Sequence, residues 1–163
     1  MGAVLSCAFI LIDTMVDANF EEYSLANISL FYQDVLPFDG GEEHSLNWIS
    51  SIVNEHQFEL SSLNYIFCDD EQLHKINLEH LDHDTYTDII TFDYSDEAST
   101  LEGDIYISLD RIKDNATQLD KSFDEELHRV LIHGVLHLLG YNDKTMAEKD
   151  EMREKENTCL SLR

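Results

Sequence analysis

The stretch SFDEELHRVLIHGVLHLLGYND, from Ser122 to Asp143, decides how the rest of the chain is interpreted. Ser122 and Glu125 have the spacing of a capping box, in which both side chains bind free backbone N–H groups at a helix start. Gly140 marks the expected end of that helix, because glycine readily adopts the left-handed conformation that terminates helices. Apolar residues occupy nearly every side of the helix from Val130 to Leu139, so we expect it to be buried.

Two histidines interrupt this apolar pattern. His133 and His137 are four residues apart, which places both imidazoles on the same face of a helix. Buried imidazoles need partners, and the two alternatives are backbone carbonyls within the core or a shared metal ion. Gly140 lets the chain turn back, so that Asp143 returns toward the rings. Three ligands with one open position are typical of a catalytic zinc site, so the sequence predicts one zinc ion bound by His133, His137 and Asp143.

Length and composition set further bounds. A chain of 163 residues forms one domain with a sizeable core. Its net charge of −24 favours solubility and opposes nonspecific binding to nucleic acid or to an anionic membrane. An RNA substrate would therefore need a local basic or metal-centred patch, or a partner protein. The three cysteines, Cys7, Cys68 and Cys159, have no motif spacing and indicate reduced thiols in the cytoplasm.

The N-terminal part is the least informative. Residues 1–24 are interpreted as an extension of uncertain structure ahead of one domain at 25–163. The apolar run Ala3 to Ile12 is too short to span a bilayer, so no membrane association is expected. The acidic segment from Asp13 to Glu22 is interpreted as a solvated linker.

Local patterns over the rest of the chain predict an α+β fold. It is a single domain with a small mixed sheet of about four strands and packed helices, among which the metal-binding helix is central. Strands are expected at residues 28–32, 63–68, 89–94 and 105–109, the last two forming a hairpin. Helices are expected at residues 45–56, 70–80, 111–119 and 122–139, followed by a charged C-terminal helix that begins at a second capping box, Thr145 with Glu148.

Three motifs resemble one known family. HGVLHLLGYND at His133–Asp143 is similar to the signature H-G-x-L-H-L-x-G-Y-D-H of the YbeY family, bacterial metal-dependent endoribonucleases linked to ribosomal RNA maturation. TDIITF at 87–92 is similar to the family's T-D-V-L-S-F, and GDIYIS at 103–108 to its G-D-I-x-I-S. The resemblance extends from about Ile28 onward. It implies a mixed sheet with a zinc site in a cleft beside it, and cleavage of single-stranded RNA in ribosomal RNA or the small ribosomal subunit.

The chain departs from the family pattern at two places. The family's first two zinc-binding histidines fall on His133 and His137, but its third histidine falls on Asp143, a harder ligand that can widen the choice of metal. The family's tyrosine-arginine pair falls on His80-Leu81, which removes a guanidinium suited to phosphate. Lys75, Arg111 and Arg129 are candidate replacements. His80 and His83 could form a second metal pair, although two exposed loop histidines are the favoured interpretation.

Three acidic residues have both a structural and a functional interpretation. Asp88 is an open candidate for the proton acceptor beside the cleft, whereas Asp104 is assigned a structural role in a turn. Glu126 lies on the same helical face as His133 and could be an outer partner of an imidazole, although the helix dipole alone would also favour a glutamate in the first turn.

Two other functions compete with RNA cleavage. A metzincin-type metalloprotease has the same ligand register, H-E-x-x-H-x-x-G-x-x-H or aspartate last. Such a protease needs glutamate as its general base where this chain has Gly134. Gly134 itself is explained equally by close approach of a substrate or by tight helix packing. The third function is a non-catalytic ribosome assembly factor, which the negative charge and the absent arginine favour. A ribosome-associated protein partner is possible in each ribosomal case.

Overall fold

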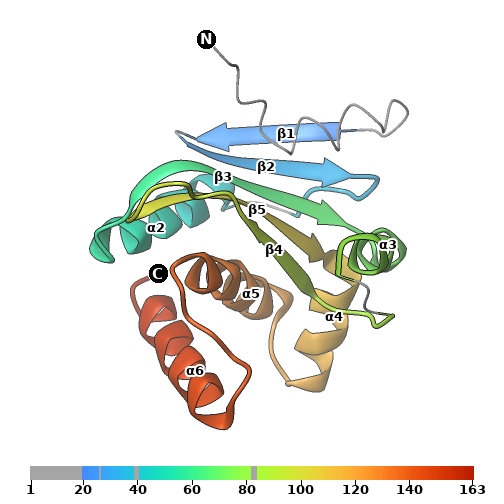
Figure 1. Ribbon diagram of the computed structural model, residues 1–163. Helices are drawn as coiled ribbons and strands as arrows, with labels where there is room; N and C mark the ends of the chain where they lie inside the picture. The colour runs from blue at the N-terminus through green and yellow to red at the C-terminus, as the bar shows by residue number, and fades with distance from the viewer. Residues whose placement is uncertain (1–19, 26, 39–40, 82–83) are drawn as a thin grey trace.

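The computed structural model describes residues 20–25, 27–38, 41–81 and 84–163, and its elements are shown in Figure 1. Five strands form one sheet: β1 (Phe20–Leu25), β2 (Ile28–Gln33), β3 (Glu59–Cys68), β4 (Ile89–Asp93) and β5 (Thr100–Ser108). The described helices are α2 (Glu42–Glu55), α3 (Asp70–Leu81), α4 (Leu109–Gln118), α5 (Phe123–Leu138) and α6 (Met146–Leu160). The predicted α+β class and the order of the predicted elements are confirmed.

The sheet is mixed, with the strand order β1-β2-β3-β5-β4. β2, β3 and β5 are parallel, while β1 and β4 are antiparallel edge strands paired with β2 and β5. The predicted hairpin is thus the β4–β5 pair. The sheet has five strands rather than the expected four, because Phe20–Leu25 pairs with Ile28–Gln33. The strand therefore begins inside the segment that was expected to be a solvated linker, most of which lies outside the described residues.

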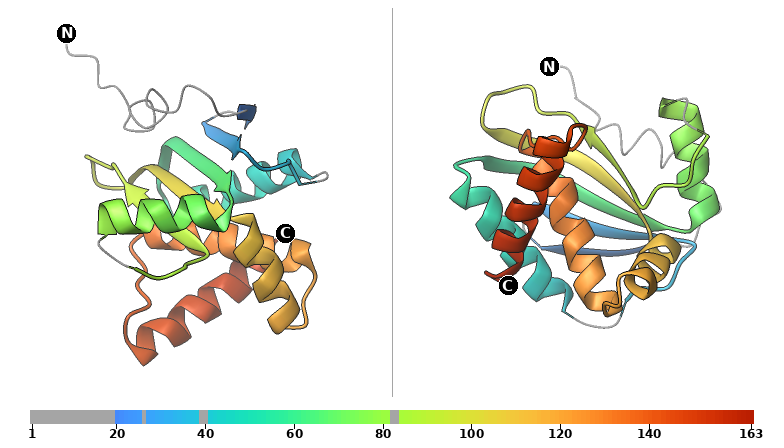
Figure 2. Two further views of the ribbon diagram at one scale, coloured as in Figure 1. Left: turned by 90° about the vertical axis from the view of Figure 1, so that its right-hand side faces the viewer. Right: turned by 90° about the horizontal axis from the view of Figure 1, so that it is seen from below.

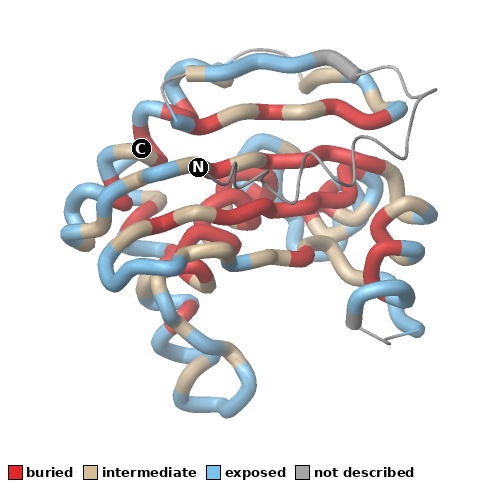
Figure 3. The backbone as a smooth tube through the Cα atoms, turned by 45° about the horizontal axis from the view of Figure 1, so that its top comes forward, coloured by how far each residue is buried: buried red, intermediate tan, exposed pale blue. Residues whose placement is uncertain are grey.

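The two faces of the sheet are covered unequally. Figure 2 shows α2, α4, α5 and α6 gathered on one side of the sheet, and Figure 3 shows buried residues along the central strands and on parts of the helices. That side holds the larger core, in which β3 and β5 contribute Leu63, Tyr65, Ile105 and Ile107. The residues between them face the other way and form a smaller core under α3, which includes Ile66 and Tyr106.

Helix α5 lies unusually close to the sheet at Gly134. A Cβ atom added there would lie 2.9 Å from Cδ1 of both Ile105 on β5 and Ile89 on β4. Such distances are too short for carbon atoms in contact, so only glycine allows this approach without repacking. Of the two explanations left open by the sequence, tight packing of the helix accounts for Gly134.

The ends of α5 agree with the predicted signals. The Ser122 Oγ accepts from the backbone N–H of Glu125 at 3.1 Å, and the Glu125 carboxylate accepts from the N–H of Ser122 at 2.9 Å. These bonds also lower the pKa of Glu125. After the helix, Gly140 has φ of +97°, the left-handed conformation that was expected. The same capping box is present at Thr145 and Glu148, which starts α6.

Within the described part of the chain, no helix has the length and apolar character needed to cross a bilayer. The cysteines in that part, Cys68 and Cys159, are both free and buried, and Cys7 lies outside it.

Candidate metal centre

The structure brings the three predicted ligands together at the C-terminal end of α5. Nε2 of His133 and Nε2 of His137 are 3.0 Å apart. The turn at Gly140 carries Asp143 back toward them, so that its Oδ2 lies 3.9 Å from His133 Nε2 and 3.8 Å from His137 Nε2. Among the described residues, these three form the one group whose side chains could hold a metal ion.

The other nitrogen of each ring faces an acceptor. His133 Nδ1 lies 2.7 Å from Glu156 Oε1 on α6, and His137 Nδ1 lies 3.0 Å from the backbone carbonyl of Tyr141. A carboxylate and a carbonyl can only accept, so each Nδ1 carries the hydrogen and donates it. In the neutral rings, both Nε2 atoms then present lone pairs toward one another.

This arrangement fits a bound cation. Two lone pairs at 3.0 Å, with the Asp143 carboxylate close by, repel one another unless a positive charge lies between them. A tetrahedral zinc ion with bonds of about 2.0–2.1 Å would place its ligand atoms roughly 3.3 Å apart. The observed separations of 3.0, 3.8 and 3.9 Å bracket that value.

The environment of His137 favours the neutral ring. Burial lowers the pKa of His137, and the neighbouring His133 lowers it further. A neutral imidazole is the form that binds a metal ion, because its free lone pair is the ligand. Asp143 is more open, with 43% of its side chain exposed, so one side of the centre faces solvent.

Behind His133 lies a network of charged side chains centred on Arg129. Its guanidinium binds both carboxylate oxygens of Glu126, at 2.8 and 2.7 Å, and reaches Glu156 Oε1 at 3.3 Å. A third carboxylate, that of Asp88, lies 3.6 Å from the same guanidinium. The hydrogen bonds to Glu126 are the largest reason why the pKa of Arg129 is raised. The network connects the start of β4 to a predicted metal ligand through one cation.

Two acids with predicted roles, Glu126 and Asp88, both face Arg129. Glu126 is buried and binds Arg129, and the acid that contacts the His133 imidazole is Glu156. Asp88 lies just before β4, where its Oδ2 accepts from Asn115 Nδ2 at 3.1 Å and faces Arg129. Its side chain is 27% exposed, and its role as a proton acceptor stays a prediction.

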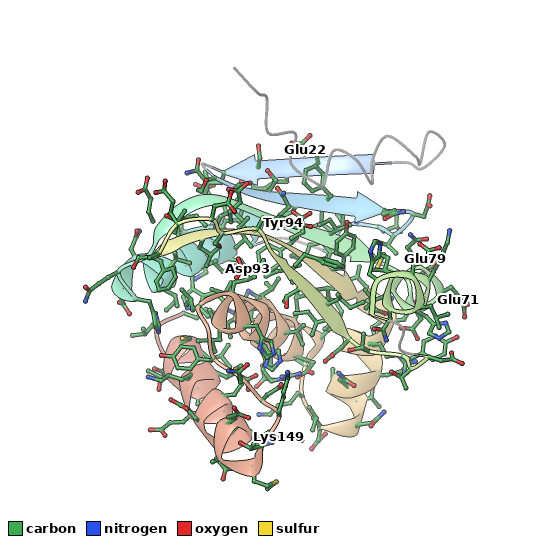
Figure 4. The ribbon with its side chains drawn as sticks, in the orientation of Figure 1. Glu22, Glu71, Glu79, Asp93, Tyr94 and Lys149 are labelled. Carbon is green, nitrogen blue, oxygen red and sulfur yellow. The ribbon has the colours of Figure 1, made fainter. Side chains whose placement is uncertain are left out.

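Asp104 has a structural position inside β5. It is fully buried on the face of the sheet away from α5, where it accepts from Asn64 Nδ2 at 2.7 Å and from the Tyr94 hydroxyl at 3.3 Å. Asn64 is its partner across the β3–β5 ladder, and Tyr94 follows β4, as Figure 4 shows. Burial raises the pKa of Asp104. The carboxylate joins β5 to β3 and to the segment that follows β4, rather than holding the single turn expected.

The three candidate replacements for the family arginine are Arg129, Arg111 and Lys75, and they have different surroundings. Arg129 is engaged by three carboxylates, and Arg111 by Asp70 and Asp114, so neither guanidinium offers a free bidentate face. Lys75 is exposed on α3, beyond the face of the sheet opposite to α5. Leu81 ends α3, and its side chain is outside the described part of the chain. The two arginines are thus occupied by carboxylates, and the lysine lies on the same helix as Leu81.

The position of His80 does not support the suggested second metal pair, His80 with His83. The His80 ring packs edge-on against Phe92 at 5.6 Å between ring centroids, and His83 lies outside the described residues.

Sequence reasoning missed Glu156, although a signal was present. Met152, Glu156 and Cys159 recur at intervals of four and three residues, so the glutamate lies within the buried stripe of α6. An acid in such a stripe needs a partner on the element that the helix packs against. Glu156 did not stand out in the sequence, because many other residues of this helix are also charged.

Comparisons with known proteins agree with the motifs. A family model described as Endoribonuclease YbeY matches residues 36–162. The chain is 48% identical over 135 residues to the protein named endoribonuclease YbeY of Amoebophilus asiaticus, covering 83% of this chain and 92% of that protein. It is 43% identical over 149 residues to the one from Flavobacterium johnsoniae, covering 91% and 96%.

A solved structure has the same fold. The solution structure of TM1509 from Thermotoga maritima matches with a TM-score of 0.57 and 26% identity, covering 76% of this chain and 84% of that one. Together with the family match over most of the chain and the topology, this establishes that the chain belongs to the YbeY family.

Proposed function

We propose that this protein is a zinc-dependent endoribonuclease that cuts single-stranded RNA during ribosomal RNA processing and ribosome maturation in the cytoplasm. One observation carries the metal requirement: both histidines direct Nδ1 to an acceptor, so their Nε2 lone pairs converge beside Asp143. The names of its relatives, endoribonuclease YbeY, support the reaction class.

In this proposal, His133, His137 and Asp143 hold the ion, and its open side takes water or substrate. A bound zinc ion would supply polarisation of a phosphoryl oxygen, a more acidic bound water, or both. Asp88 is the candidate proton acceptor, because its partly exposed carboxylate adjoins Ile89, which packs against α5 beside His133. Arg129, which also reaches Glu156, lies 3.6 Å from that carboxylate.

The distribution of charge suggests how RNA reaches so acidic a protein. Residues 144–163 contain five basic and five acidic residues, so the whole net charge of −24 is carried by the preceding part of the chain. Lys144 directly follows Asp143, and the Lys155 ammonium lies 5.3 Å from the centre of the Tyr141 ring. The side of the centre formed by α6 is therefore the proposed approach for RNA phosphates.

Peptide hydrolysis is not favoured. The glutamate base of a metzincin would stand at Gly134, and that position is pressed against Ile105 and Ile89 of the sheet. Glycine carries no carboxylate, and a larger side chain would have to displace these isoleucines, so the proposed site lacks the base that such proteases use. A non-catalytic assembly factor remains as an outcome of the experiment below.

The test supplies purified protein with zinc and offers it a single-stranded RNA, the matching duplex and casein. We expect cleavage of the single strand alone, loss of cleavage with a chelator, and loss in His137→Ala with an unchanged circular dichroism spectrum. Equal cleavage by His137→Ala would mean that the site is not responsible. Binding to ribosomal particles without cleavage of any RNA would favour the assembly factor.

A further inference from the structure

Glu156 is an acid in an unusual position. It lies on α6, 23 residues beyond His133 in the chain, and is only 7% exposed. Its Oε1 accepts the Nδ1 hydrogen of His133 at 2.7 Å. A buried carboxylate is costly unless its charge is paired and its oxygens are bonded. The position therefore needs both a donor and a cation, and the structure supplies both.

Arg129 is the cation. It lies one turn before His133 on α5, and its guanidinium reaches the same Oε1 at 3.3 Å. The guanidinium is itself fixed by two hydrogen bonds to Glu126, whose side chain is 1% exposed. Because Arg129 is held at one end by Glu126, it can hold Glu156 in one orientation at the other. The imidazole of His133 then meets a fixed acceptor.

We infer that Glu156 is a positioning residue for the metal centre: it holds His133 in the Nδ1–H tautomer, with Nε2 directed at the ion, and Arg129 anchors it. This inference rests on the proposed metal site. A carboxylate behind a ligating histidine also makes the ring a stronger donor, and loss of such a partner typically weakens metal binding 10–100-fold. Helix α6 thus completes the centre without providing a ligand.

The same helix carries an internal reporter of its own position. Met152 and Cys159, on either side of Glu156, are buried in the main core. The indole N–H of Trp48, the one tryptophan in the sequence, donates to the carbonyl of Cys159 at 3.0 Å. Emission of Trp48 therefore reports whether α6 remains docked when Glu156 is changed.

The experiment compares wild type with Glu156→Ala, Glu156→Gln and a control, Glu151→Gln, which changes an exposed acid on the same helix. Zinc affinity is measured by competition with a chromophoric chelator. We expect a 10–100-fold loss in Glu156→Ala. Glu156→Gln should lose less, because its amide oxygen still accepts from Nδ1. Glu151→Gln should equal wild type.

A second readout uses the metal-free protein. Long-range ¹H–¹⁵N correlation spectra report which ring nitrogen of His133 carries the hydrogen. We expect the Nδ1–H form in wild type, Glu156→Gln and Glu151→Gln, and a mixture of tautomers in Glu156→Ala. Trp48 emission should remain at the wild-type wavelength in all four proteins.

Two results would overturn the role of Glu156. One is zinc affinity in Glu156→Ala within twofold of wild type. The other is a loss of zinc affinity in Glu156→Ala that is accompanied by a red shift of Trp48 emission, while His133 keeps its Nδ1–H form. Glu156 would then only hold α6 in place. If wild type binds no zinc at all, the proposed function fails instead, and the tautomer spectra still decide the role of Glu156.

Discussion

Arg129 and Arg111 are each surrounded by carboxylates, yet their surroundings differ in burial and in what lies beyond them. Arg129 pairs with Glu126 and Glu156, whose side chains are 1% and 9% exposed. Arg111 on α4 pairs with Asp70 at 2.7 Å and with Asp114 at 2.9 Å, whose side chains are 17% and 54% exposed.

The two networks also lead to different places. From Arg129 the contacts continue through Glu156 to His133. From Arg111 they continue through Asp70 to Ser108, whose hydroxyl donates to Asp70 and whose oxygen caps α4. One network contacts a proposed metal ligand, and the other joins the starts of two helices. The number of ion pairs alone therefore does not set the consequence of losing them, because exposed pairs contribute little and buried acids left without a partner cost much.

The largest effect is expected for Arg129→Met. This change leaves Glu126 and Glu156 buried without their cation, which typically costs about 3–5 kcal/mol. The free energy of unfolding, measured with urea in the metal-free protein, should fall by that amount.

The matched change, Arg111→Met, sharpens the comparison. Arg111 pairs with partly exposed acids, so the unfolding free energy should fall by only about 0–1 kcal/mol. Equal losses in the two variants would show that burial of the partner acids is not what separates these networks.

Stabilisation by zinc should depend on Arg129 but not on Arg111. At free zinc 100-fold above its dissociation constant, binding to the folded state adds about 2.7 kcal/mol. We expect this increment, measured as the difference between thermal or urea unfolding with zinc and with a chelator, in wild type and in Arg111→Met. It should shrink in Arg129→Met at the same zinc concentration, because Glu156 then loses its anchor. An undiminished increment would separate the Arg129 network from the metal centre.

Gly134→Ala tests the packing that places α5, and with it Arg129 and the histidines, on the sheet. The added methyl group would lie 2.9 Å from Ile105 and Ile89, and overpacking of this kind costs about 1–3 kcal/mol. Urea unfolding should show this loss. Ile89→Val and Ile105→Val remove the two Cδ1 atoms. The cost of Gly134→Ala should therefore be smaller when it is added to this double valine variant than when it is added to wild type. An equal cost in both backgrounds would mean that the contact is not the reason for glycine.

His128, adjacent to Arg129 on α5, gives an effect that depends on pH. Burial lowers the pKa of His128, so between that folded value and the unfolded value of about 6.5 the unfolded chain binds more protons. The stabilising contribution is complete above about pH 6.5 and is lost as the pH falls toward the folded pKa. The stability difference between wild type and His128→Gln should therefore shift in favour of wild type as the pH rises through this range. A difference independent of pH would contradict it.

The sequence predicted α5 and the grouping of its ligands because the signals are local. The capping box, the apolar pattern, the spacing of His133 and His137 and the turn at Gly140 all lie within one segment, where helical geometry fixes the relation between residues. Asp143 could be placed near the rings for the same reason.

What the sequence did not reveal depends on contacts between distant segments. β1 forms an edge of the sheet and contains Glu21 and Glu22. Its sequence lacks the strong apolar alternation that would have predicted a strand paired with β2. Glu156 reaches His133 only because α6 packs on α5. The reason for Gly134 likewise lies in the isoleucines of two strands.

The central claim is that His133, His137 and Asp143 converge on one cation, and metal stoichiometry tests it most directly. Protein prepared without a histidine tag, supplied with zinc and freed of excess metal, is analysed by native mass spectrometry. We predict one zinc ion per chain in wild type and none retained in the double variant His133→Gln, His137→Gln. No zinc in wild type, or as much in the double variant, would contradict the account.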